Sequence, residues 1–120
     1  MMTKSASALL VAFGLLAGST WAQPTSVTDD VQEGKRLALL ICANCHIVAS
    51  DQPFPPILQP PAPAFNSIAQ RTSFSADSIR TFLTTMHRDT TNPVSMPNLQ
   101  LVDYEIKALV AYLSSLRKPL

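Results

Sequence analysis

The chain has 120 residues, which is enough for one small domain. Its formal net charge is only +1, and it carries no basic stripe of the kind that nucleic-acid-binding proteins use. Two cysteines can form at most one disulfide, so a disulfide framework cannot stabilise the domain. A large apolar cofactor could supply the core surface that so short a chain lacks.

The first 22 residues are typical of a secretory signal peptide. Lys4 is their only charge, an apolar run covers residues 8–17, and small residues close the region. A permanent membrane span needs about 20 apolar residues, so this run is too short for one. We expect cleavage after Ala22 and export to the periplasm, with an uncleaved signal anchor as the alternative. The mature domain, residues 23–120, would then hold eight basic and eight acidic residues and no net charge.

The first predicted helix begins near Asp29 or Asp30 and runs directly into Cys42. Asp30 and Glu33 have the spacing of a capping box, in an Asp variant. Apolar residues then fall mostly on one stripe of this helix: Val31, Leu37, Ala38, Leu40 and Ile41.

A proline-rich segment follows. Residues 53–63 hold six of the ten prolines, which excludes a regular helix or sheet there. A short helical turn is predicted around residues 65–69.

A second long helix is predicted within residues 75–87, where Ser75 or Asp77 can cap the N-terminus. Its apolar stripe has helical spacing and consists of Ile79, Phe82, Leu83 and Met86. A second proline-bearing loop, residues 91–98, comes after it.

The last predicted helix is the clearest, and Asp103 can cap it. Arg117 and Lys118 near its end suit the helix dipole, and Pro119 stops it. One apolar face is formed by Ile106, Leu109, Val110, Leu113 and Leu116. Because no segment has a strand pattern, the predicted fold class is all-α.

The sequence CANCH brings Cys42, Cys45 and His46 together. A thioredoxin-like redox pair would need a βαβ context, and structural zinc needs four ligands, for which His87 is the only further candidate. A disulfide here would close a very short loop and stabilise little. Two thiols at this spacing can add to the vinyl groups of one haem, with His46 placed as an axial iron ligand. The motif therefore favours one covalently bound haem c.

The second axial ligand must then come from elsewhere in the mature chain, which offers Met86, His87 and Met96. Met86 lies on the apolar stripe of its predicted helix, where core packing explains it. Met96 lies in a loop that prolines make rigid, and no helical pattern accounts for it. We favour Met96, with Met86 as the alternative; a Met/His pair raises the reduction potential and suits an electron carrier.

These residues resemble the class I c-type cytochromes in their short bacterial form, over essentially the whole mature chain. Gly34 stands eight residues before Cys42, and "LVAYL" with Tyr112 is similar to the family's last helix. "MPNLQL" followed by "DYEIKALVAYL" is similar to the methionine-ligand loop and closing helix, which strengthens the choice of Met96. The resemblance implies a cytochrome c fold of three main helices and loops around one haem. It also implies that Gly34 lets the first and last helices approach closely.

The resemblance further implies a proline carbonyl that accepts a hydrogen bond from the haem-ligating histidine, and Pro55 or Pro56 is our expectation. The chain departs from the family pattern at Ala38, where many members have an aromatic residue. The mature chain has no tryptophan to bond a haem propionate, so Arg71, a hydroxyl group or water must serve.

We therefore expect a periplasmic monohaem cytochrome that carries single electrons between redox partner proteins and is not an enzyme. It would be a monomer, or loosely associated with a redox enzyme, without a membrane span after signal cleavage. Two other functions remain open: a haem c subunit of a dehydrogenase or oxidase complex, and a ligand-binding haem sensor.

Overall fold

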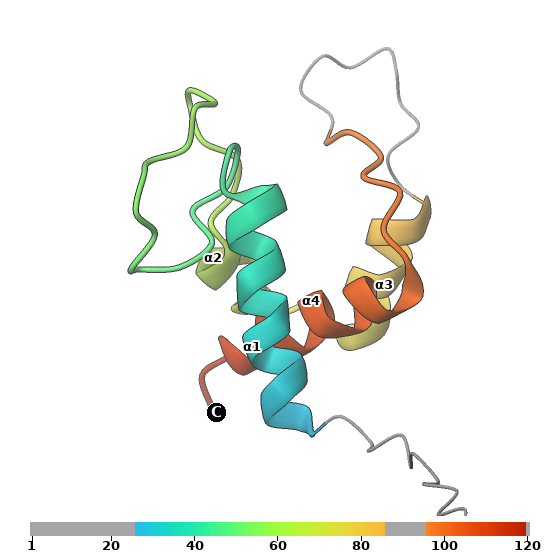
Figure 1. Ribbon diagram of the computed structural model, residues 1–120. Coiled ribbons are helices and arrows are strands. Elements are labelled where there is room, and N and C mark those ends of the chain that lie inside the picture. The colour runs from blue at the N-terminus through green and yellow to red at the C-terminus, as the bar shows by residue number, and fades with distance from the viewer. Residues whose placement is uncertain (1–25, 86–95, 120) are drawn as a thin grey trace, which may run out of the picture.

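The described part of the chain, residues 26–85 and 96–119 of a computed structural model, is helical and contains no strand (Figure 1). Its elements are α1 (Val27–Leu37), the π-helical turn η1 (Ala38–Cys42), α2 (Phe65–Ala69), α3 (Ala76–Thr85) and α4 (Asp103–Ser115). The predicted all-α fold class is confirmed. Within these ranges, no helix has the length and apolar character needed to cross a membrane.

The capping box at the start of α1 lies earlier than predicted. Ser26 is the N-cap: its Oγ accepts from the N–H of Asp29 at 3.2 Å, and its own N–H donates to the Asp29 carboxylate at 3.0 Å. The proposed pair of Asp30 and Glu33 was therefore wrong. Glu33 instead forms an ion pair within the helix, and Asp30 pairs with Lys107 on α4 at 2.8 Å. Asp30 thus helps to join the two helices.

The π-turn was not predicted, although the helix does run into Cys42 as expected. The N–H of Ala43 donates to the carbonyl of Ala38 at 3.0 Å, a spacing of five residues. The wider turn changes which side chains face the core. Leu37, Ala38 and Cys42 are buried, whereas Leu40, which we placed on the stripe, is 67% exposed.

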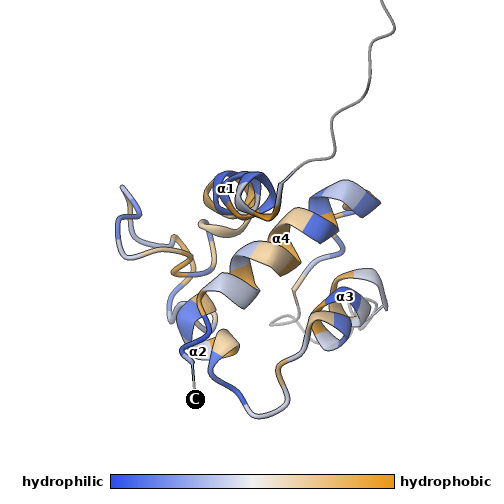
Figure 2. Cartoon of the chain, turned by 90° about the horizontal axis from the view of Figure 1, so that it is seen from below, coloured by the Kyte–Doolittle hydropathy of each residue, from blue (hydrophilic) through white to orange (hydrophobic). Residues whose placement is uncertain are grey.

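The centre of the fold is the crossing of α1 with α4 (Figure 2). A Cβ atom at Gly34 would lie 2.7 Å from the Cβ of Tyr112 and closer still to the carbonyl group of Ala108. Only a residue without a side chain permits this approach. The predicted role of Gly34 is confirmed, and buried residues from α1, the π-turn and α4 form the core around it: Leu37, Ala38, Ala108, Leu109, Tyr112 and Leu113.

Helix α4 has the predicted apolar face, but its ends differ from the prediction. Val102 occupies the N-cap position and donates its N–H to Glu105 at 3.0 Å, so Asp103 is the first helical residue and not the cap. The helix ends at Ser115, before the basic pair. Arg117 donates to the carbonyl of Phe74 at 3.1 Å and lies over the Phe74 ring, which fixes the segment before α3 to the end of α4.

Helix α3 contrasts with α4, because none of its residues is buried. Its start agrees with the prediction: Ser75 Oγ accepts from the N–H of Ser78 at 3.0 Å. Ile79 and Leu83 of the predicted stripe are half-buried, and Phe82 is 41% exposed. Met86 lies outside the described residues. Among the described residues, the apolar stripe of α3 is therefore incompletely buried.

The proline-rich segment, hereafter the proline loop (residues 53–63), contains no regular helix or strand, as predicted. It leads into α2, whose bounds match the predicted helical turn (Figure 1). An isolated parallel bridge joins His46 to Ala62, so the end of the loop lies beside His46.

Candidate functional site

The CANCH segment (residues 42–46) follows from the π-turn and starts inside the core. Cys42 is 7% exposed and Cys45 is half-buried, and both are free thiols. Burial, with a smaller contribution from the charge of Cys45, raises the pKa of Cys42 to about 11. The Cys42 thiol is therefore neutral at pH 7, and neither sulfur atom is used in a disulfide.

His46 is buried, at 9% exposure, and its orientation is fixed by one strong contact. Its Nδ1 lies 2.7 Å from the carbonyl oxygen of Pro63. Because a carbonyl can only accept, Nδ1 carries the hydrogen, which leaves Nε2 with the lone pair that a metal needs. The ring of Phe65 meets the imidazole edge-on, with 5.5 Å between ring centroids.

The carbonyl that binds His46 belongs to Pro63, so the expectation of Pro55 or Pro56 was wrong. The end of the loop lies beside His46: the bridge joins His46 to Ala62, and the next carbonyl along the chain is that of Pro63. Such a bond fixes the ring of a metal-ligating histidine and raises its basicity.

The proline loop also binds the backbone of the CANCH segment. Asn44 O accepts from the N–H of Ile57 at 2.8 Å, and Cys45 O accepts from the N–H of Ala62 at 2.8 Å. Directly after the segment, Ile47 O accepts from the N–H of Phe65 at 2.9 Å. The sequence pattern did not predict these contacts, because prolines indicate only that a loop is irregular and not where it binds.

Helix α4 completes this side of the site through Tyr112. Its hydroxyl donates to the carbonyl of Val48 at 2.8 Å, in a buried position two residues after His46. Its ring lies 6.4 Å from that of Phe65, centroid to centroid. Burial raises the pKa of Tyr112 above its ordinary value of 10. His46, Phe65, Tyr112 and Val48 therefore form one packed group that spans the CANCH segment, α2 and α4.

The other predicted ligands lie on a different part of the chain. Met96 is half-buried in the segment that leads to α4, whereas Met86 and His87 fall outside the described residues. In this segment Asn98 Oδ1 accepts from the N–H of Gln100, which has a positive φ of 51°, so the chain turns sharply before α4. In Figure 1 this segment, drawn in orange, and the end of the π-turn both extend to the same side of α4. Ligation by Met96 stays a prediction.

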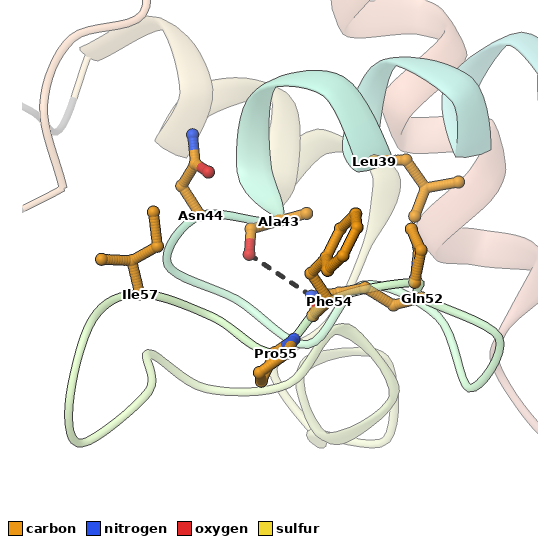
Figure 3. Close-up of a pocket in the computed structure, with 8 residues that line it drawn as sticks. Leu39, Ala43, Asn44, Gln52, Phe54, Pro55 and Ile57 are labelled. Carbon is orange, nitrogen blue, oxygen red and sulfur yellow. Dashed lines mark hydrogen bonds between the residues drawn. The ribbon is translucent and has the colours of Figure 1, made fainter.

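A pocket of about 320 Å³ lies between the π-turn and the proline loop (Figure 3). Gln52 and Phe54 lie close to Ala43 there, and a hydrogen bond joins the Gln52 side chain to the Ala43 carbonyl. The lining is mainly apolar and consists of Leu39, Ala43, Asn44, Gln52, Pro53, Phe54, Pro55 and Ile57.

Two features of the chain fit a haem. Two free thiols stand beside a histidine whose Nε2 is available. The apolar stripe of α3 has no buried residue, so a large apolar group has surface to pack against.

An all-α fold with this cysteine–histidine arrangement defines a c-type haem protein. The family model for cytochrome c matches residues 31–117, and the chain belongs to that family as a class I c-type cytochrome. It binds haem c covalently, and it is an electron-transfer protein and not an enzyme.

Among characterised proteins, the chain is similar to cytochrome c-552 of Bradyrhizobium diazoefficiens. The two are 32% identical over 93 residues, which cover 78% of this chain and 81% of the relative. No solved structure matches the chain.

Proposed function

We propose that this cytochrome is a periplasmic single-electron carrier. In the proposal, Cys42 and Cys45 bond the haem, and His46 and Met96 are the axial iron ligands. Residues 1–22 are a signal peptide that is removed after Ala22, and residues 23–120 are the mature domain.

The observation that carries the proposal is the bond between His46 Nδ1 and Pro63 O. It commits one ring nitrogen to the protein and leaves the other for iron, on the residue that directly follows Cys45. Phe65 packs against the ring and limits its rotation. A histidine held in this way needs little rearrangement when the iron changes its charge, which favours rapid electron transfer.

When bound, haem would supply an iron that gains and loses one electron. The thioether of Met96 would be the sixth ligand, and its pairing with histidine favours the ferrous state relative to two histidines. The apolar side chains of α3 would keep water from the haem face that the CANCH segment does not cover. With no net charge after signal cleavage, the carrier would meet its redox partners through short-lived apolar contacts, as a monomer or loosely associated with a redox enzyme.

The proposal is tested on protein exported in cells that attach haem. We expect the intact mass of residues 23–120 plus one haem, retained under denaturing conditions. The ferrous protein should bind carbon monoxide only slowly, because Met96 occupies the sixth position. Rapid binding of carbon monoxide would instead identify a ligand-binding sensor. A mass that includes residues 1–22 would overturn the cleavage after Ala22.

A further inference from the structure

Gln52 makes an unusual set of contacts at the start of the proline loop. Its Oε1 accepts from the N–H of Val48 at 2.9 Å. Its Nε2 donates to the carbonyl of Phe54 at 2.7 Å and to that of Ala43 at 3.3 Å. Both donors and the acceptor of one amide are therefore used, and all three partners are backbone groups (Figure 3 shows the bond to Ala43).

Two backbone partners of Gln52 lie on either side of Cys45 and His46. Ala43 follows Cys42, and Val48 comes two residues after His46. One side chain thus bridges the backbone before and after the pair Cys45–His46. Its third bond, to Phe54, holds the first residues of the proline loop, whose last residue, Pro63, binds the His46 ring.

One of the three bonds of Gln52 is made to a buried residue, Val48. Its residue exposure is 1%, and Gln52 is the acceptor for its N–H. A buried N–H without an acceptor is strongly disfavoured, so the backbone after His46 has to move when the amide is removed. The carbonyl of the same residue accepts from Tyr112, so any movement also affects the contact with α4.

We propose that Gln52 is a positioning residue for His46, and this inference rests on the proposed ligation by His46. By binding Ala43, Val48 and Phe54 together, Gln52 sets the path of the CANCH segment relative to the proline loop. That path determines whether the Pro63 carbonyl reaches His46 Nδ1, and through this bond Gln52 adjusts the electron donation of the imidazole to iron. Neither asparagine, which is one methylene shorter, nor glutamate, which lacks the two donors, can make all three bonds.

Gln70 provides a matched control, because it also makes three hydrogen bonds through its amide. Nε2 donates to Asn66 Oδ1 and to the carbonyl of Leu116, and Oε1 accepts from the N–H of Lys118. The bonds with Leu116 and Lys118 join the end of α2 to the end of α4, the bond to Asn66 is local to α2, and none of the three involves the CANCH segment. Gln52→Leu therefore removes three hydrogen bonds around the CANCH segment, and Gln70→Leu removes the same number away from it.

The experiment compares the holo forms of the wild type and of both variants. NMR of the diamagnetic ferrous state gives the solvent-exchange rate of the His46 Nδ1 hydrogen, and a redox titration gives the midpoint potential. We expect Gln52→Leu to accelerate this exchange at least tenfold and to shift the midpoint potential. For Gln70→Leu, we expect an exchange rate within twofold of the wild type and an unchanged midpoint potential. If Gln52→Leu does not retain haem, Gln52→Glu, which keeps the acceptor for Val48, is expected to change both quantities in the same direction.

The outcomes separate this inference from the proposed function. Unchanged exchange and potential in the Gln52 variants, with a wild type whose spectrum shows histidine ligation, would overturn the positioning role alone. Equal changes in the Gln52 and Gln70 variants would also overturn it, because they would reflect general loss of stability. A wild type without histidine ligation would contradict the proposed function itself.

Discussion

The surroundings of His46 and those of α3 are built differently. On the His46 side, the chain supplies its own support: the proline loop binds the CANCH segment, Pro63 binds the imidazole, and Tyr112 ties the following backbone to α4. On the side of α3, no helical residue is buried, and part of the apolar surface is exposed.

This difference indicates that the two regions are stabilised in different ways. On the histidine side, hydrogen bonds within the chain hold the backbone and the imidazole in place, so this geometry does not depend on the haem. In the described part of the chain, the apolar side chains of α3 are not buried, so we expect their packing to depend on the cofactor. Mutations in the two regions should therefore differ in kind: those on the first side change the stability of the polypeptide core, and those on the second act mainly through the haem.

The largest expected effect comes from a pair of leucines, one on each side. Leu109 is 2% exposed in α4, and Leu109→Ala should lower the free energy of unfolding by about 3–4 kcal/mol through lost burial and a cavity. Leu83 is half-buried in α3, and Leu83→Ala should cost about 1–2 kcal/mol. Denaturant unfolding of the holo proteins measures both. Equal losses would contradict the difference between the two sides.

Gly34→Ala should have the next largest effect. The new Cβ would meet the Ala108 carbonyl and the Tyr112 Cβ, so α1 and α4 would have to separate. We expect a loss of about 2–3 kcal/mol, despite the better helix propensity of alanine. Gln32→Ala, at an exposed position of the same helix, is the control and should have little effect. A Gly34→Ala protein as stable as this control would show that the helix crossing tolerates a wider spacing.

Tyr112→Phe should have a smaller effect. Loss of the hydroxyl leaves the Val48 carbonyl without this donor and should cost about 1–2 kcal/mol at pH 7. The pKa of Tyr112 is raised by burial above its ordinary value of 10, so above pH 10 the unfolded chain releases this proton before the folded chain does. Wild-type stability from this group is thus complete below pH 10 and falls as pH rises further. The stability difference between the two proteins should shrink above pH 10; a constant difference would contradict the buried hydroxyl.

Asp51→Asn should have the smallest effect. Asp51 pairs with Lys35 at 2.8 Å on the surface, and the hydrogen bond from Lys35 lowers the pKa of this carboxyl below its ordinary value of 3.8. The stabilisation is therefore present above that value and disappears as pH falls through the lower, folded-state pKa. Unfolding curves of the two proteins should differ slightly at pH 7, less in high salt, and converge in acid. A larger difference in acid than at pH 7 would contradict the pairing.

Much of the fold could be predicted from the sequence, because local patterns determine it. The apolar spacing of α4, the helical turn at Phe65, and the small residue at position 34 each depend on a few neighbouring side chains. The starts of the helices were harder to predict. Ser26 caps α1, whereas Asp30, which could also serve as a cap, forms an ion pair with a residue of α4. Sequence spacing does not distinguish a cap from a contact between helices.

The hydrogen bonds that hold the CANCH segment and His46 in place could not be predicted, because they come from the proline loop, which is distant in the sequence. Pro63, and not Pro55 or Pro56, binds His46 because Ala62 pairs with the CANCH segment. The π-turn could not be predicted either, because the residue types from Ala38 to Cys42 are equally compatible with an ordinary α-helix. One signal was available for Gln52: it is a polar residue directly before a proline-rich, uncharged stretch, although that pattern does not reveal its partners.

The most direct test of the account is the absorption spectrum of the ferric holo protein with Met96→Ala and Met86→Ala as a pair. The sulfur-to-iron charge-transfer band reports a methionine bound to iron. We predict that Met96→Ala abolishes this band, whereas Met86→Ala retains it and all three proteins keep the covalent haem. Loss of the band in Met86→Ala, with the band intact in Met96→Ala, would contradict the assignment of the sixth ligand.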